Sequence, residues 1–156
     1  MFRLLATFCL ITSQALWAVE IPKTKDLQQA YIETGRNSSG QEKVVMLLVS
    51  QPNCHYCLLI TEEIIHPMLL SGRYESTTFF SELEINTGGS IKDFNGQQVG
   101  ANTFAQRYNA WATPTLLFLN NKGEEIAEEM VGINTLDLYG YYVDKALNIA
   151  FKKINP

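Results

Sequence analysis

The sequence predicts a single α/β domain, and three observations point to it. The chain has 156 residues, a length at which one hydrophobic core is the rule. Its composition is 46% hydrophobic and 18% charged, which is typical of a compact soluble core rather than of a disordered or polytopic membrane chain. Apolar runs of strand length also alternate with segments of helical periodicity. Since no segment is repeated, we expect one domain.

The charge balance argues against a nucleic-acid partner. Twelve Lys and Arg residues against sixteen Asp and Glu residues give a net charge of -4. No stretch of the chain carries a run of five or more like charges. Proteins that neutralise phosphates need clustered basic side chains, so we expect no binding to DNA or RNA.

The first 18 residues differ in character from the rest. Arg3 precedes a largely apolar run over residues 4–17, Ala18 is a small residue at its end, and the stretch contains no acidic residue. This layout is typical of a secretory signal peptide, so we expect residues 1–18 to be cleaved, leaving a domain of residues 19–156. The run is shorter than the roughly 20 apolar residues of a membrane-spanning helix. An uncleaved membrane tether is the alternative.

Export would place a single pair of cysteines in an oxidising compartment. Cleavage removes Cys9 and leaves Cys54 and Cys57 as the cysteines of the mature chain. Cys9 lies within the apolar run rather than after it, which argues against a lipid attachment site. A disulfide framework beyond the Cys54–Cys57 pair is therefore excluded.

The first elements of the mature chain are predicted to be a helix, a buried strand and a second helix. Apolar residues recur at helical spacing over residues 22–35, with Gly35 placed as the C-cap. Residues 44–49 form a continuous apolar run without alternation, which predicts a central strand covered on both faces. After a short loop, a helix begins at the cysteine pair, and Pro67 is expected to kink or end it.

The middle of the chain predicts a strand, an irregular connection and a short helix. Residues 79–85 alternate well enough for a second strand. Glycines punctuate residues 86–100, for which we expect an irregular connection. A short helix is expected to follow over residues 102–109.

The last third of the chain predicts a hairpin and a closing helix. Residues 115–119 and 124–131 flank the turn sequence Asn-Asn-Lys-Gly of residues 120–123, which predicts two antiparallel strands. Asn134 is a favourable N-cap, and the apolar residues that follow keep one helical face. An amphipathic helix is therefore expected to end the chain.

Two intervening residues separate the cysteines at the start of a helix, as dithiol chemistry requires. A dithiol exchanges electrons with protein disulfides when one thiol is exposed and acidic and the second can resolve the mixed disulfide. The helix N-terminus offers free N–H groups and a positive partial charge to Cys54, so we expect Cys54 to be the nucleophile. Cys57, one turn inside, is expected to be buried and to act as the resolver. His55, when protonated, adds a cation that favours the thiolate.

Three other uses of the pair are weaker. Zinc usually takes four ligands, and the other soft candidates here are His55 and His66. Covalent haem attachment requires a histidine directly after the second cysteine, where this chain has Leu58. An inert structural disulfide closing so short a loop contributes little chain-entropy stabilisation. Redox chemistry is the better account of the pair.

The order of elements and two motifs resemble the thioredoxin superfamily over residues 26–153. The motifs are the cysteine pair and the sequence Trp-Ala-Thr-Pro-Thr of residues 111–115. The resemblance implies a single-domain thioredoxin fold, an α/β architecture with a central mixed β-sheet flanked by helices. It also implies that Pro114 forms a cis peptide bond beside the cysteines and that Thr113 offers backbone groups to a substrate strand. An ordinary proline at the start of a strand is the alternative.

Among subfamilies, the exported form and the glycine-containing insertion look most like the SoxW-type periplasmic thioredoxins. Tyr56 and Thr113 also resemble residues of the periplasmic disulfide isomerases, and His55 and Tyr56 are the candidates for adjusting the reactivity of the thiolate. Those isomerases carry a separate N-terminal dimerisation domain. Residues 19–43 are too few to form one, so we expect a monomer.

The sequence departs from the thioredoxin pattern around the cysteines. Asn-Cys-His-Tyr-Cys replaces the familiar Trp-Cys-Gly-Pro-Cys, and Leu48 stands where thioredoxins place a buried acidic residue. Proton transfer at Cys57 therefore lacks its usual carboxylate. A bound water, His55, Glu62 and Glu63 are the candidate substitutes.

The resemblance implies a periplasmic thiol–disulfide oxidoreductase that acts as a reductase. Its expected partners are protein disulfide or dithiol substrates and, as electron donor, a membrane-bound thiol reductase. No cofactor is expected, because the cysteine pair itself carries the electrons. The alternative from another class is a thioredoxin-like binding module or metallochaperone that holds copper or zinc on the dithiol.

Two further features receive no functional role. His66 stands before Pro67 at the end of a helix, where a histidine is expected to be a capping or surface residue. Tyr139, Tyr141 and Tyr142 are expected to pack in the core or at an interface, with Tyr139 on the apolar stripe of the last helix.

Overall fold

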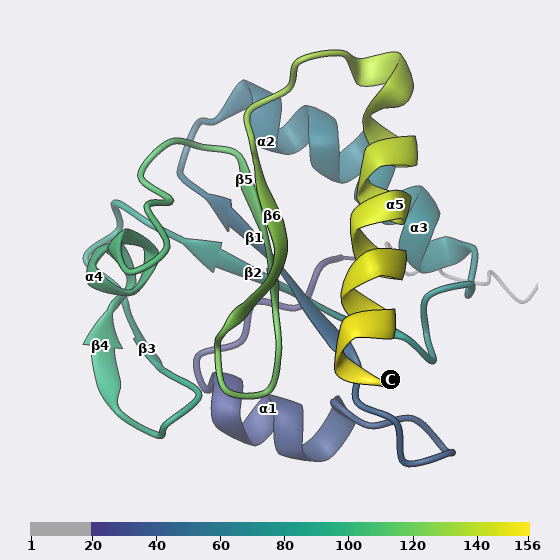
Figure 1. Cartoon of the computed structure of the whole chain (residues 1–156). Coiled ribbons are helices and arrows are strands. Elements are labelled where there is room, and N and C mark those ends of the chain that lie inside the picture. The colour runs from purple at the N-terminus through teal and green to yellow at the C-terminus, as the bar shows by residue number, and fades with distance from the viewer. Residues whose placement is uncertain (1–19) are drawn as a thin grey trace, which may run out of the picture.

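Helices cover both faces of one mixed β-sheet in this chain, for which a computed structural model describes residues 20–156 (Figure 1). The α/β architecture expected from the sequence, with its central mixed sheet, is confirmed. The predicted signal peptide of residues 1–18 lies outside the described residues. Within residues 20–156, no helix combines the length and the apolar character needed to cross a membrane.

The sheet has four strands in the order β2-β1-β5-β6. They are β1 (Val44–Ser50), β2 (Thr78–Glu84), β5 (Thr115–Leu119) and β6 (Glu125–Val131). β1 pairs parallel with β2 and antiparallel with β5, and β5 pairs antiparallel with β6. All seven residues of β1 are buried, because both of its neighbours are strands and both of its faces are covered. The prediction of a central, doubly covered strand is confirmed.

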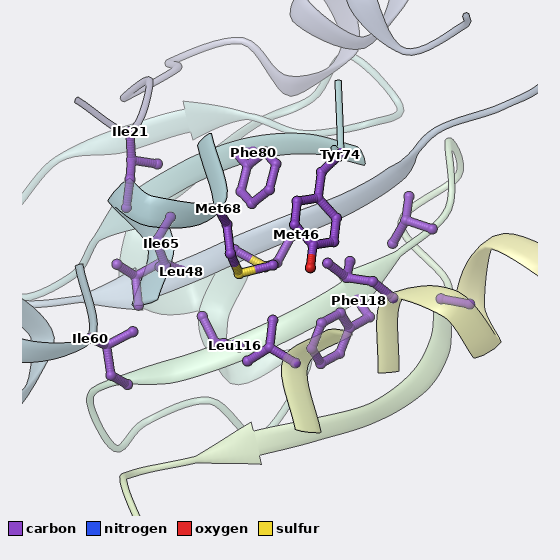
Figure 2. Packing of buried hydrophobic residues seen from close by; sticks show 14 of the residues in the cluster. Ile21, Met46, Leu48, Ile60, Ile65, Met68, Tyr74, Phe80, Leu116 and Phe118 are labelled. Carbon is purple, nitrogen blue, oxygen red and sulfur yellow. The ribbon is translucent and has the colours of Figure 1, made fainter. Parts of the chain in front are cut away.

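One face of the sheet packs against α2 (His55–Ile60), α3 (His66–Leu70) and α5 (Leu136–Ile154), which lie on the same side of the sheet in Figure 1. Alternate residues of β1 point into this layer. Figure 2 shows Met46 and Leu48 of β1 packed with Met68 of α3 and Phe80 of β2. This apolar layer supports the helix that begins at the cysteine pair.

The opposite face packs against α1 (Leu27–Thr34), α4 (Ala101–Gln106) and a small second sheet. Leu27 of α1 and Phe104 of α4 are both 0% exposed and share one apolar cluster with Val45 and Leu47 of β1. α1 ends at its C-cap Gly35, as predicted, and begins after Asp26, whose carboxylate accepts the N–H of Gln29.

The expectation of an irregular connection over residues 86–100 is wrong. This segment forms the hairpin of β3 (Ser90–Lys92) and β4 (Gln98–Gly100). Its turn is organised by Asp93, whose Oδ1 accepts the N–H groups of Asn95 and Gln97 at 2.9 and 3.0 Å. Side-chain capping of the turn therefore supports strands of only three residues each.

The helix that begins at the cysteine pair continues through Pro67 rather than ending there. Between α2 and α3 lies the π-helical turn η1 (Thr61–Ile65), in which the N–H of His66 bonds to the carbonyl of Thr61, five residues earlier. The wider turn admits the proline ring, which in a regular α-helix meets the carbonyl four residues before it. The irregularity of this helix is thus a π turn that precedes the proline.

The predicted cap of the last helix is one residue early. Thr135, not Asn134, is the N-cap of α5, with φ -147° and ψ 110°. The Thr135 side chain makes no capping hydrogen bond. The prediction of Asn134 assumed that such a bond sets the start of the helix, and here it does not. The apolar stripe of the helix is as predicted and includes Tyr139, Val143 and Leu147.

Candidate active site

The cysteine pair lies where β1 leads into α2. Asn53 precedes it with φ 59°, a left-handed conformation that asparagine tolerates, and turns the chain from the strand into the helix. Cys54 is the N-cap of α2. Its Sγ accepts the backbone N–H of Cys57 at 3.1 Å, which places a free N–H of the first helical turn on this sulfur.

The two cysteines form a disulfide and differ in exposure. Their sulfurs are 2.05 Å apart and their Cα atoms 5.2 Å apart. Cys57 is 6% exposed, whereas Cys54 is of intermediate burial. A protein substrate can therefore approach Cys54 more readily than Cys57.

The loop before β5 lies against the cysteine pair. The Thr113 hydroxyl donates a hydrogen bond to Sγ of Cys54 over 3.5 Å. The Thr113–Pro114 peptide bond is cis. Pro114 is buried, and its carbonyl accepts the N–H of Gly132 at 2.8 Å. The motif of residues 111–115 and the cysteine motif, far apart in the sequence, thus meet at one sulfur.

The two residues between the cysteines point outward. His55 and Tyr56 are both exposed, with ring centroids 5.7 Å apart. Within the described part of the chain, neither side chain makes a hydrogen bond to a sulfur. Their position beside Cys54 is as the sequence indicates, and the structure shows no direct polar contact through which they act on it.

A cavity of about 670 Å³ opens beside the cysteines. Both Cys54 and Cys57 line it, together with polar residues from the N-terminal segment, the ends of β1 and β2, and α3. Neither Thr113 nor Pro114 is among its lining residues. The cysteine pair therefore borders two distinct regions, the cis-proline loop and the cavity.

Glu82 of β2 is the most enclosed carboxylate of this cavity. Its side chain is 16% exposed, and its Oε1 accepts a 2.6 Å hydrogen bond from the hydroxyl of Ser50. Lys23 Nζ lies 3.6 Å from Oε2 of Glu82 and 3.2 Å from Oε2 of Glu84. The hydrogen bond from Lys23 to Glu84, with the charges of both glutamates, raises the pKa of Lys23 despite partial desolvation. Neither Glu82 nor Ser50 was expected at the site from the sequence.

Glu62, Glu63 and His66 differ in their positions relative to the cavity. Glu62 and Glu63, considered as substitutes for the missing carboxylate, are exposed and do not line the cavity. His66 is the C-cap of η1, as a capping role predicts, but it is half-buried and also lines the cavity. Its Nε2 is buried and finds no hydrogen-bond partner among the described residues. No local sequence signal distinguishes His66 from an ordinary helix-end histidine, because the π turn sets the direction in which it points.

Metal ligands are sparse around the pair. Across residues 20–156, no three His, Cys, Asp or Glu side chains are grouped so that they could hold a metal ion. A metal held by the reduced pair would therefore have two thiolates as its protein ligands. This arrangement is poorer than the three or four ligands of common zinc sites.

The family model of the thioredoxin-like domain matches residues 33–146 of this chain. The chain belongs to the thioredoxin-like domain family. Members of this family act on protein disulfide or dithiol substrates. Because this member carries the Cys54–Cys57 disulfide at the start of a helix, it is a thiol–disulfide oxidoreductase. No curated protein matches the chain by sequence.

Solved structures share the fold of this thioredoxin-like protein at low sequence identity. The DsbH oxidoreductase is 12% identical with a TM-score of 0.53, over 92% of this chain and 95% of that one. Mitochondrial thioredoxin 3 from Saccharomyces cerevisiae, in its oxidised form, is 12% identical with a TM-score of 0.52, over 82% and 93%. Fasciola hepatica thioredoxin is 13% identical with a TM-score of 0.50, over 82% and 97%. These similarities establish the thioredoxin fold.

Proposed function

We propose that this protein is an exported oxidoreductase that reduces disulfide bonds of client proteins in the periplasm, with Cys54 as nucleophile and Cys57 as resolver. The observation that carries the chemistry is the asymmetry of the pair. Cys54 caps the helix and accepts an N–H at its sulfur, whereas Cys57 is 6% exposed. The proposal of export rests on the layout of residues 1–18. The reducing direction rests on the resemblance to SoxW-type thioredoxins.

In the reducing direction, the reaction has two exchange steps. The Cys54 thiolate attacks one sulfur of the client disulfide, which forms a mixed disulfide and releases the other client sulfur as a thiolate. Cys57 then loses its proton and attacks Sγ of Cys54, which releases the second client sulfur. Two electrons pass to the client, and the enzyme ends with the Cys54–Cys57 disulfide. A dithiol donor, for which we propose a membrane-bound thiol reductase, restores the reduced pair.

The cis-proline loop is the proposed docking edge for the client backbone. Among residues 20–156, the N–H and C=O groups of Thr113 have no backbone partner, so they are free to pair with an extended client segment. Trp111 and Tyr56 are 73% and 59% exposed on the two motifs beside it. Pro114 holds the loop in place, and the protein is proposed to act as a monomer.

Trapping of mixed disulfides tests this function. The Cys57→Ser protein, incubated with a disulfide-bonded client protein, is expected to accumulate a covalent complex that dithiothreitol dissolves. The Cys54→Ser protein is the matched control and is expected to form no complex and to have no reductase activity. Full activity of Cys54→Ser, or equal trapping by both variants, contradicts the assignment of the nucleophile.

A further inference from the structure

The second exchange step needs a proton acceptor close to Cys57. Cys57 is 6% exposed, and only the thiolate attacks a disulfide, so a proton acceptor near this residue speeds the step. The residue six positions before Cys54 is Leu48, which is 0% exposed and carries no acid–base group. An acid–base group for this step therefore has to come from another part of the chain.

The register of the sheet places such a carboxylate beside Leu48. In the parallel ladder of β1 and β2, Leu48 pairs with Glu82, and residues in register project from the same face of a sheet. Leu48 belongs to the same apolar cluster as Ile60 of the helix that carries Cys57. Glu82 consequently leaves the sheet on the face that the cysteine-bearing helix covers, one strand to the side of Leu48.

The cavity connects this carboxylate to the cysteines. Cys54, Cys57, Ser50 and Glu82 all line it. Ser50 is 3% exposed and donates its hydroxyl proton to Oε1 of Glu82 over 2.6 Å. This hydrogen bond fixes the orientation of the carboxylate, so Ser50 positions Glu82 beside the cavity.

Other charged or titratable groups line the same cavity as Glu82. Lys23 from the N-terminal segment lies 3.6 Å from Oε2 of Glu82. Glu84 shares that lysine at 3.2 Å but has twice the side-chain exposure of Glu82, 33% against 16%. Glu20, His55 and His66 complete the titratable lining. His66 follows Cys57 by nine residues, which places it more than two helical turns further along the helix.

We propose that Glu82, held by Ser50, is the proton acceptor for Cys57, a role that rests on the proposed oxidoreductase function. As the mixed disulfide resolves, the Cys57 proton passes through the cavity to Glu82. The Cys57 thiolate forms the bond to Sγ of Cys54, and the client sulfur leaves with the electron pair of the broken bond. In the reverse reaction, protonated Glu82 returns the proton to Cys57. Ser50 is a positioning residue in both directions.

Single-turnover kinetics of the reduced, full-length protein with a disulfide-bonded client test this role. In Glu82→Gln, formation of the mixed disulfide by Cys54 is expected at the wild-type rate. Its resolution at pH 7 is expected to slow by about 100-fold, a usual effect of losing general-base catalysis. At about pH 9, above the ordinary pKa of a thiol near 8.5, the rate is expected to approach that of the wild type. Ser50→Ala is expected to show the same pattern more weakly.

Glu84→Gln is the matched control, since Glu84 lies on the same strand and shares Lys23. It is expected to resolve the mixed disulfide within about 2-fold of the wild type. Wild-type resolution by Glu82→Gln at pH 7, or an equal loss in Glu84→Gln or His66→Asn, overturns the proposal. A wild-type protein that forms no mixed disulfide contradicts the oxidoreductase function itself, so the two failures are distinguishable. Circular dichroism of each variant shows whether its fold is retained.

Discussion

The hydroxyl of Thr113 donates to Sγ of Cys54 across 3.5 Å, which joins two motifs separated by 59 residues. The same sulfur accepts the backbone N–H of Cys57 at 3.1 Å. Both donors favour negative charge on this sulfur, since hydrogen bonds to an ionised acceptor are stronger than those to a neutral one. Cys54 therefore lies in an environment that stabilises a thiolate.

Removing the Thr113 hydroxyl is expected to make Cys54 less reactive. Because the bond is long, we expect Thr113→Val to lower the rate of iodoacetamide alkylation of reduced Cys54 at pH 7 by roughly 2- to 5-fold, which corresponds to about 0.5–1 kcal/mol. Thr113→Ser keeps the hydroxyl and is expected to react within about 2-fold of the wild type. Equal rates for Thr113→Val and the wild type would show that this hydroxyl does not stabilise the thiolate.

The buried carboxylate of Asp93 is expected to make stability depend on pH. Burial alone raises the pKa of this carboxyl, but hydrogen bonds from Arg107, Gln97 and Asn95 outweigh burial and hold the pKa below its ordinary value. Such a group stabilises the fold above its unfolded-state pKa of about 3.9, and this contribution is lost as the pH falls through the folded-state value.

Urea denaturation of Asp93→Asn tests this dependence. At pH 7 the variant is expected to lose roughly 1.5–3 kcal/mol of unfolding free energy, because an ionised acceptor of Arg107 is removed. The difference from the wild type is expected to shrink as the pH falls below about 4. A difference that stays constant from pH 7 to pH 3 would show that the ionisation of Asp93 does not contribute.

Two buried tyrosines allow the free-energy cost of burying an unpaired hydroxyl to be measured against a hydrogen-bonded one. The hydroxyl of Tyr139 is buried and has no hydrogen-bond partner among the described residues, and burial raises the pKa of this group. The hydroxyl of Tyr31 donates to the carbonyl of Lys43 over 3.1 Å. Tyr139→Phe is expected to leave stability unchanged or to raise it by up to about 1 kcal/mol, whereas Tyr31→Phe is expected to lose about 1 kcal/mol. Thermal unfolding measures both, and a larger loss in Tyr139→Phe would indicate that its hydroxyl has a partner.

Local sequence patterns were sufficient to predict the elements around the cysteines and the β5–β6 hairpin. The continuous apolar run of β1, the cysteine pair at the start of α2 and the Asn-Asn-Lys-Gly turn between β5 and β6 each depend on neighbours in the sequence. The turn of the β3–β4 hairpin could also have been predicted from the sequence. Its turn contains Asn95 followed by Gly96, a common hairpin signal, but its strands are too short for a recognisable alternation.

The cavity beside the cysteines could not be predicted from the sequence. Glu82 and Ser50 are 32 residues apart, and their contact depends on the register of the parallel β1–β2 pair. That register is set when the helices pack on the sheet, since a parallel pair has no tight turn to define it. His66 was missed for a related reason: the π turn before it changes the helical phase, and no residue pattern marks such a turn.

The central claim, that Cys54 and Cys57 form a redox centre that works as a reductase, is tested most directly by the reduction potential of the pair. The protein is equilibrated against dithiothreitol or glutathione buffers, and its free thiols are trapped and counted. We predict one two-electron transition near the thioredoxin value of about -270 mV. A value near -120 to -180 mV would contradict the reducing direction. If no two-electron transition is found, the pair is not a redox centre, and metal binding by the dithiol becomes the better account.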